Sequence, residues 1–254
     1  MSTIVRQYTS DGFVIASDGR GGFSDGREPI ADCQKIFCFP SAPNLAFSFV
    51  GTVQLGSAFS FFDTVRSTLP KLLPISVSLM DYALKLSYVV RQILTALRSQ
   101  GWIRFTEDPS ELFVHSGSRA PNFTIAYVLI DGYFRGVAGR GYIRFSHENQ
   151  RISEPEWIPI PLSDAVLANG SAAVVNIYET DPRFGSYRNY DSKLHQSLVL
   201  SRAANLAKGL VEAQGGPEGR ALDAATCATI GGRTHIAIIT PTEGFSWIPG
   251  FGPA

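Results

Sequence analysis

The sequence predicts an α+β fold in which two stacked antiparallel sheets lie between two helical layers, a four-layer αββα sandwich. The first observation is the order of elements: short strands, two helices, more strands, a further helix and final strands. The second is the stretch GFVIAS at residues 12–17, whose apolar residues do not alternate with polar ones, so this strand needs cover on both faces. The third is that no repeat and no long linker divides the chain, which predicts one domain over residues 1–254.

Composition and charge exclude several classes of partner. Of the 254 residues, 44% are hydrophobic and 17% are charged, as in ordinary folded proteins. Lys and Arg number 22, and Asp and Glu also number 22. Because the chain has no net charge to attract nucleic acid or an anionic membrane surface over long range, we predict neither as a partner.

The cysteines and the N-terminus bear on the compartment. Cys33, Cys38 and Cys227 are odd in number and lie in apolar sequence, which favours reduced thiols over disulfides. Cys33 and Cys38 have no second pair with which to complete a zinc site, so we expect no metal and no cofactor. The opening residues lack the apolar stretch of a secretory signal, and no run reaches the roughly 18 apolar residues of a membrane span, so we expect a cytoplasmic protein.

The N-terminal strands are predicted from short β-branched and aromatic runs. Residues 3–7 and 12–17 flank TSDG, whose Asp-Gly pair favours a hairpin. CQKIFCF and NLAFSFVG form a second predicted pair around the turn PSAPN, and Gly51 ends it.

Two helices are predicted next, because apolar residues then recur every three or four positions. The first helix is expected to stop at Pro70, and its apolar face consists of Leu55, Phe59, Phe62, Val65 and Leu69. The second is expected over residues 78–100, with Gly101 as its C-terminal cap.

The second half of the chain predicts further strands and one long helix. NFTIAYVLID and YFRGVAG indicate a hairpin around Asp131-Gly132, which GYIRFS continues. Residues 151–161 contain several prolines and are expected to be irregular, whereas AVLANGSAAVV fits a strand or a helix. A third helix is expected over residues 191–214, followed by RTHIAIIT and GFSWIP as the last strands.

The tetrapeptide SDGR occurs twice, and the two copies have different contexts. The first, residues 17–20, ends a buried strand, whereas the second, residues 24–27, lies in a glycine-rich loop and is expected to form a turn. The loop is not followed by the Lys-Ser or Lys-Thr of a phosphate-binding loop. The four histidines form no evident triad, and His235 is expected to be a strand residue with a backbone partner.

Three stretches carry a resemblance to a known family. They are Ser2 directly after Met1, GFVIASDGR at residues 12–20, and DCQKIF followed by AFSFVG up to Gly51. In this order and spacing they resemble the β subunits of the proteasome and their bacterial relatives, which are N-terminal nucleophile hydrolases. The order of predicted elements matches that family over most of the chain, but the motifs match only as far as Gly51.

The resemblance implies a catalytic role for five residues. Removal of the initiator methionine would make Ser2 the nucleophile and its α-amine the base. Asp18, sixteen residues after Ser2 as in the family, would hold the ammonium of Lys35, which comes one residue later than usual. The backbone N–H of Gly51 would be an oxyanion donor, and Ser171 would be a polar partner of the amine.

The chemistry explains why such residues belong together. A serine hydroxyl is a poor nucleophile until a base removes its proton, and an N-terminal amine with a pKa of about 8 suits that task. An ammonium beside the hydroxyl stabilises developing negative charge, and a buried carboxylate holds that ammonium in place.

The C-terminal part departs from the family pattern. Alignment of Gly231-Gly232 with the family's paired glycines puts Ile230 where a serine is expected and Cys227 where an aspartate is expected. Neither side chain can hold an ammonium as a carboxylate would. Other groups, such as Asn169 or Ser171, would then position the amine, or the activity has been lost.

Thr3 is an alternative N-terminal residue. If a further cleavage made Thr3 the first residue, its spacing to Asp18 would be one residue shorter than in the family, which disfavours this alternative.

The sequence therefore predicts a proteasome-like, homo-oligomeric hydrolase of peptide or amide bonds that acts through Ser2. The resemblance implies contacts between subunits through the helical layers, with STLPKLLP and SAFSFF as candidate surfaces. The alternative is a catalytically inactive assembly or scaffold subunit with the same fold. A third reading is a small-molecule amidase in which Arg20 or Arg27 binds a substrate carboxylate.

Overall fold

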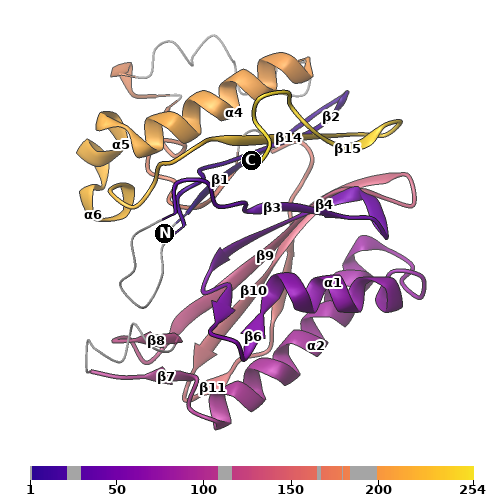
Figure 1. Ribbon diagram of the computed structural model, residues 1–254, viewed down its shortest axis with the longest axis vertical. Coiled ribbons are helices and arrows are strands. Elements are labelled where there is room, and N and C mark those ends of the chain that lie inside the picture. Colours follow the sequence, from indigo (N-terminus) through magenta and orange to yellow (C-terminus); the bar gives the residue numbers. More distant parts are fainter. Residues whose placement is uncertain (1, 22–29, 108–115, 165–166, 179, 184–198) are drawn as a thin grey trace.

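Two stacked antiparallel sheets form the centre of the computed structural model (Figure 1), which describes residues 2–21, 30–107, 116–164, 167–178, 180–183 and 199–254. The second SDGR copy with Arg27, the histidines at positions 115 and 195, and the first part of the third expected helix lie outside the described residues.

The first sheet has the strand order β13-β1-β2-β14-β15. Its strands are β1 (Thr3–Thr9), β2 (Gly12–Ser17), β13 (Leu167–Gly170), β14 (His235–Thr240) and β15 (Gly244–Trp247). Every residue of β2 is buried, as the unbroken apolar run predicts, because β2 is covered on both faces. The predicted final strands are confirmed, and LANG at residues 167–170 forms the edge strand β13.

The second sheet has the order β11-β10-β9-β4-β3, and β12 also pairs with β10. Its strands are β3 (Ile36–Phe39), β4 (Ala42–Gly51), β9 (Phe123–Phe134), β10 (Val137–Glu148), β11 (Arg151–Ile152) and β12 (Glu156–Pro159). The expectation of irregular structure over residues 151–161 is thus wrong in part, because edge strands tolerate proline at their ends.

The predicted turn at Asp131-Gly132 is wrong, because β9 continues through both residues. Asp131 is buried and forms an ion pair with Arg6 of β1. Gly132 has a φ of +136°, and a Cβ built there would lie 2.1 Å from the Asn44 carbonyl oxygen, so glycine permits close approach of β4. The chain turns instead at Arg135-Gly136, where both residues have positive φ as in a two-residue hairpin loop.

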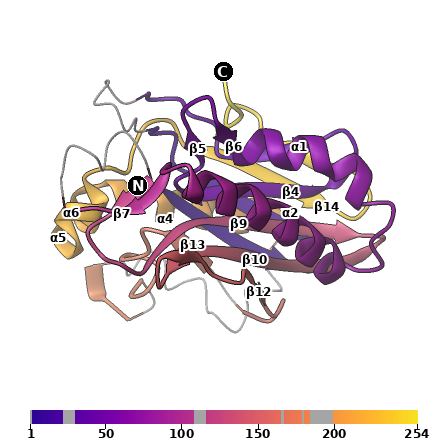
Figure 2. The same cartoon turned by 90° about the horizontal axis from the view of Figure 1, so that it is seen from below.

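Helices cover the outer face of each sheet. α1 (Phe61–Leu72) and α2 (Leu79–Ser99) lie across β4, β9 and β10 of the second sheet (Figure 2), and α4 (Leu200–Gly215) covers the first sheet. The expected cap of α2 at Gly101 is confirmed by the φ of +82° at that residue. Two unpredicted short helices follow α4, namely α5 (Pro217–Leu222) and α6 (Ala224–Cys227).

The first helix begins and ends later than its apolar spacing predicts. Leu55 and Phe59 lie in a short hairpin formed by β5 (Gln54–Leu55) and β6 (Phe59–Ser60), which mimics helical spacing. Ser60 then caps α1 by accepting from the Asp63 N–H. Pro70 lies within the last turn and does not stop the helix. A smaller parallel pair consists of β7 (Ile103–Phe105) and β8 (Ser116–Ser118).

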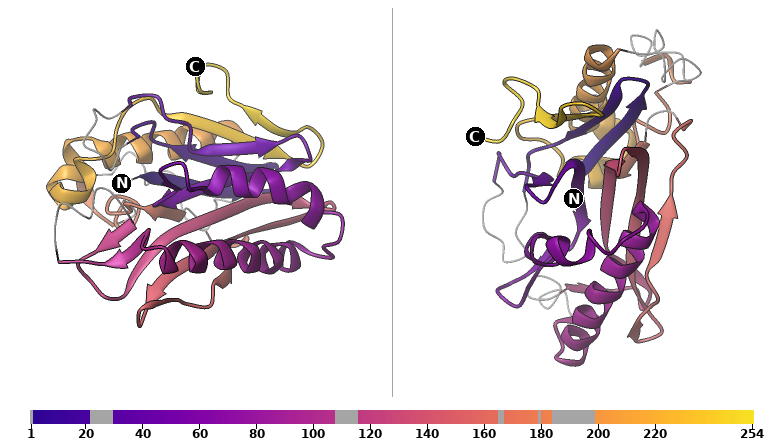
Figure 3. Two further views of the ribbon diagram at one scale, coloured as in Figure 1. Left: turned by 60° about the horizontal axis from the view of Figure 1, so that its bottom comes forward. Right: turned by 90° about the vertical axis from the view of Figure 1, so that its right-hand side faces the viewer.

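Three buried clusters confirm the four-layer arrangement (Figure 3). One packs α1 and α2 against the second sheet, one packs α4 against the first sheet, and one lies between the two sheets. Phe59 and Phe61 belong to the first cluster and are 6% and 0% exposed, so these two residues of the expected contact surface SAFSFF are core, whereas Ser57 and Ala58 are exposed. No helix among the described residues has the length and apolar character needed to cross a membrane.

Candidate active site

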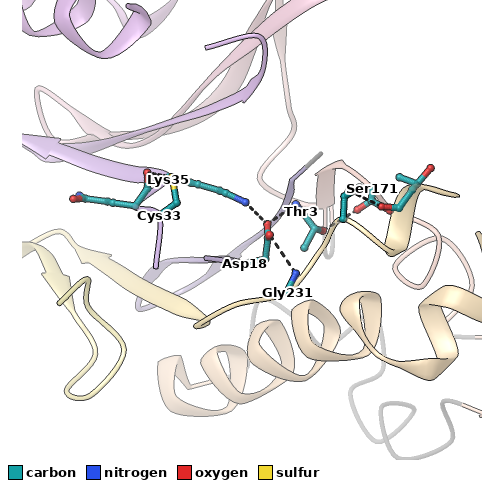
Figure 4. Close-up of polar contacts among 9 residues, drawn as sticks. Thr3, Asp18, Cys33, Lys35, Ser171 and Gly231 are labelled. Carbon is teal, nitrogen blue, oxygen red and sulfur yellow. Dashed lines mark hydrogen bonds and ion pairs between the residues drawn. The ribbon is translucent and has the colours of Figure 1, made fainter. Parts of the chain in front are cut away.

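Asp18 is the centre of a buried charged group at the N-terminal end of β1. It follows β2 directly, and its Oδ1 accepts from the Lys35 Nζ at 2.7 Å and from the Thr3 backbone N–H at 2.8 Å (Figure 4). The exposed fractions of the Asp18 and Lys35 side chains are 1% and 7%. The ion pair expected from the sequence is therefore present, and we call these two residues the charged side of the site.

Lys35 lies directly before β3 and not on it, which corrects the position implied by the resemblance. Burial lowers the pKa of its ammonium, and the charge and hydrogen bond of Asp18 act against that effect. Asp18 therefore helps to keep Lys35 protonated in a place that would otherwise favour the neutral amine.

Asp18 is held by backbone groups from two directions. Its own N–H donates to the Thr3 carbonyl oxygen at 3.3 Å, and the Gly231 N–H approaches its Oδ2 at 3.5 Å. Gly231 in turn accepts from the Arg20 N–H at 2.8 Å. The first SDGR copy is thus joined to the glycine pair that precedes β14.

The segment Ser2–Thr3 is fixed against Ser171 by two hydrogen bonds. The Ser171 N–H donates to the Ser2 carbonyl oxygen at 2.9 Å, and the Thr3 Oγ1 donates to the Ser171 carbonyl oxygen at 2.8 Å. Gly170 permits this approach, since its φ is +90° and a Cβ built there would lie 2.0 Å from the Ser2 oxygen.

Ser2 and Thr3 differ in access to solvent. Thr3 is fully buried and its hydroxyl proton is used by Ser171, whereas Ser2 is partly exposed. This difference further disfavours the alternative in which Thr3 is the nucleophile.

Beyond Ser171 lies a second polar cluster without a charge. Gln214 of α4 donates from Nε2 to the Ser171 Oγ and, at 2.9 Å, to the Cys227 Sγ. The Cys227 Sγ is 3.6 Å from the Ser171 Oγ. All three residues are buried, and we call them the neutral side of the site.

Sequence reasoning missed Gln214. The available signal was its spacing, because Gln214 follows Leu210 by four residues and Ala207 by seven and therefore falls on the apolar face of the helix. A polar residue on that face needs a partner inside the protein.

Of the other residues aligned with polar partners of the amine or expected near it, Asn169 has a different hydrogen-bond partner and Ile230 is apolar. The Asn169 Oδ1 accepts from the Arg6 NH2 at 2.9 Å, so Asn169 belongs to the Arg6–Asp131 network between the sheets. Ile230 is 1% exposed and carries no polar group. Among the residues named beforehand, Ser171 remains the one that contacts Ser2.

Gly51 ends β4 with a φ of +99°. The β5–β6 hairpin, and not a helix, follows it, which corrects the expected strand-to-helix turn. Val50 beside it packs near Gly170, since its Cγ1 lies 3.4 Å from a Cβ built on that glycine. The end of β4 therefore approaches the Ser171 segment, although no hydrogen bond within the described chain links Gly51 to Ser2, Asp18 or Lys35.

The two histidines that the structure describes have other partners. His235 is fully buried and its Nε2 pairs with the Asp32 carboxylate, not with a backbone group as expected. This hydrogen bond lowers the pKa of Asp32. The His147 Nδ1 pairs with the Pro121 carbonyl oxygen at 3.0 Å.

Arg20 contacts the chain near the glycine pair that precedes β14. The Arg20 NH1 donates to the Ala228 carbonyl oxygen at 3.3 Å. No group of three His, Cys, Asp or Glu side chains within the described part of the chain could hold a metal ion.

Comparison with known proteins identifies the fold. No protein-family model matches the sequence, and no curated protein sequence matches it. The structure is similar to that of an Anbu (Gly-1) mutant from Hyphomicrobium sp. strain MC1, with a TM-score of 0.62 and 12% sequence identity over 99% of this chain and 89% of that chain. Anbu from Yersinia bercovieri, described as an ancestral beta-subunit, has a TM-score of 0.60 and 13% identity over 98% of this chain and 88% of that chain. At this identity the likeness shows a proteasome-like fold.

Proposed function

We propose that the protein hydrolyses peptide or amide bonds and that Ser2, freed by removal of Met1, is its N-terminal nucleophile. The observation that carries the proposal is the single Asp18 oxygen that accepts from both the Thr3 N–H and the Lys35 ammonium. This oxygen ties the residue after Ser2 to a buried cation. The fold shared with Anbu, one of whose structures is described as an ancestral beta-subunit, gives independent support.

In the proposed reaction the Ser2 α-amine takes the proton of the Ser2 hydroxyl while Oγ attacks the substrate carbonyl carbon. A C–O bond forms, and the carbonyl oxygen becomes an oxyanion. The C–N bond then breaks, and the leaving amine takes the proton from the α-ammonium, which leaves an ester on Ser2. Water attacks that ester with the α-amine again as base, which releases the acid and restores Ser2.

The charged side has two proposed tasks in these steps. The Lys35 ammonium stabilises negative charge on Oγ and favours loss of its proton, and Asp18 keeps that ammonium charged and oriented. The Gly51 N–H is proposed as the oxyanion donor, which its place at the end of β4 supports. Ser171 is proposed to contact the α-amine.

We also propose that the active form is a homo-oligomer. Met80, Leu84 and Tyr88 recur every four residues along α2 and are 56%, 44% and 62% exposed. Such an apolar stripe on an outer helix suits contact with a second copy. The mass of the untagged protein measured by light scattering after gel filtration tests this point, and a monomer at all concentrations would contradict it.

A β-lactone probe that acylates activated hydroxyls tests the catalytic proposal. We expect one adduct per chain in the wild type and none in Ser2→Ala. Ser10→Ala is the matched control, because Ser10 lies in the exposed turn between β1 and β2, and it should be labelled like the wild type. A wild type without label would contradict the hydrolase and favour the scaffold, for which the lack of a carboxylate among the three neutral-side residues is the supporting observation.

A further inference from the structure

Both polar atoms of the Gln214 side-chain amide have buried hydrogen-bond partners. Its Oε1 accepts from the Val174 N–H at 2.8 Å, and its Nε2 donates to the Ser171 Oγ and the Cys227 Sγ. The Val174 N–H can only donate, so the amide oxygen must face Val174 and the nitrogen must face the other two. Gln214 is 0% exposed, and its orientation is therefore fixed.

This orientation decides what the Ser171 hydroxyl can offer. Because Ser171 Oγ accepts from Gln214 and also bonds to the Cys227 Sγ, where either atom can be the donor, one lone pair or the hydroxyl proton remains, but not both. The backbone of Ser171 is held at both its N–H and its carbonyl by the Ser2–Thr3 segment. When the hydroxyl donates to Cys227 it can accept from an ammonium, and when it accepts from Cys227 it can donate to a neutral amine.

We propose that Gln214 is a positioning residue for the α-amine of Ser2, acting through Ser171, and that it keeps this side of the amine uncharged. The inference rests on the proposed function, since it assigns the amine the role of base. A carboxylate in this place would favour the ammonium and raise the pKa of the amine. The neutral amide instead lets the amine lose its proton near neutral pH.

The charges around the amine make this effect measurable. Among the described residues, the titratable side chains linked to the Ser2–Thr3 segment are Asp18 directly, Lys35 through Asp18, and Cys227 through Ser171. Asp18 and Lys35 neutralise each other. None of the described residues hydrogen-bonded to Gln214 is a cation that would oppose a new negative charge at position 214.

The test measures the pKa of the Ser2 α-amine from the rate of trace acetylation by acetic anhydride as a function of pH, read on the N-terminal peptide by mass spectrometry. Gln214→Glu keeps the size of the side chain and an acceptor for Val174. We expect it to raise the amine pKa by about one unit, so that the reactive neutral amine at pH 7 falls about tenfold. Asn205→Asp, an equal change at an exposed position of the same helix, should leave the pKa unchanged.

A second variant keeps the inference testable if Gln214→Glu does not fold. Cys227→Asp places the carboxylate on the other neighbour of Ser171, and the same rise is expected. An amine pKa equal to that of the wild type in a folded Gln214→Glu or Cys227→Asp protein would overturn the inference. A raised pKa together with a wild type that the β-lactone does not label would support the effect of Gln214 on the amine and contradict the hydrolase, so the two failures are distinguishable.

Discussion

The charged side and the neutral side of the site are equally buried, but they hold the Ser2–Thr3 segment by different means. Asp18 and Lys35 form an ion pair on one side, whereas Ser171, Gln214 and Cys227 form a network of neutral groups on the other. A buried ion pair needs both partners, because one charge alone is expensive. A neutral network tolerates change better, so the comparison teaches that the charged side should be far more sensitive to substitution.

Lys35→Met is expected to have the largest effect. It removes the cation proposed to stabilise the Ser2 nucleophile, and loss of one such electrostatic contact slows chemistry by about a hundredfold or more. The measurement is the rate of β-lactone labelling, with Lys71→Met on the exposed face of α1 as the matched control. Labelling of Lys35→Met within a few-fold of the wild-type rate would remove the charged side from the mechanism.

Asp18→Asn should act on both stability and pH dependence. The unpaired Lys35 ammonium is expected to cost about 3 kcal/mol in the free energy of unfolding, measured with urea. The double variant Asp18→Asn/Lys35→Met should lose less than the sum of the two single variants. Additive losses would show that the ion pair contributes nothing specific.

The same variant has a predicted pH profile. In the wild type, labelling should rise as the Ser2 amine loses its proton and fall as Lys35 loses its own, at a pKa that burial lowers from 10.5. Asp18 raises that pKa, so Asp18→Asn should move the alkaline limb to lower pH. If the alkaline limb of the Asp18→Asn profile lies at the same pH as in the wild type, proton loss from Lys35 does not cause that limb.

Stability should change in the opposite direction to labelling over this pH range. Folding lowers the pKa of Lys35, so the unfolded chain binds this proton more tightly than the folded chain does. The Lys35 contribution to stability should therefore increase as the pH rises from the lowered pKa to 10.5.

Gly170→Ala tests the close approach of Gly170 to the Ser2 backbone. A Cβ would lie 2.0 Å from the Ser2 carbonyl oxygen, so the Ser2 backbone must move. We expect a loss of about 2 kcal/mol in stability and markedly slower labelling. Gly136→Ala is the matched control, because its φ is also positive at +79° but nothing lies within 4 Å of its Cβ. Equal labelling in the two variants would contradict the role of close approach at Gly170.

Ser171→Ala should have the smallest effect of the four. It leaves one N–H of Gln214 without its oxygen acceptor, which costs about 1 kcal/mol, and labelling should slow by about tenfold. Because both backbone bonds to Ser2 and Thr3 remain, the fold should be kept. A loss as large as that of Lys35→Met would contradict the expected difference between the sides.

The sequence predicted the charged side better than the neutral side for a physical reason. Asp18 directly follows the apolar strand β2 and Lys35 directly precedes β3, so the local pattern alone places both residues at strand ends. Ser171, Gln214 and Cys227 come from a strand end and two helices, and their contacts depend on how α4 packs on the first sheet. Packing of this kind is not encoded in spacing along one element.

The errors in the predicted secondary structure also have physical causes. Leu55 and Phe59 have helical spacing but lie in the β5–β6 hairpin, since short hairpins can place apolar residues four apart. Asp131-Gly132 carries a hairpin signal, yet burial of Asp131 against Arg6 draws both residues into β9. In the second case a long-range contact outweighed the local preference, whereas in the first case two local structures share the same apolar spacing.

The central claim is that Ser2 supplies both nucleophile and base between a charged side and a neutral side, which requires a free α-amine. The intact mass of the untagged protein tests it most directly. The account predicts a mass lower by one methionine than that of the encoded chain, with Ser2 as the first residue. Retention of Met1 in the purified protein would block the amine and contradict the account.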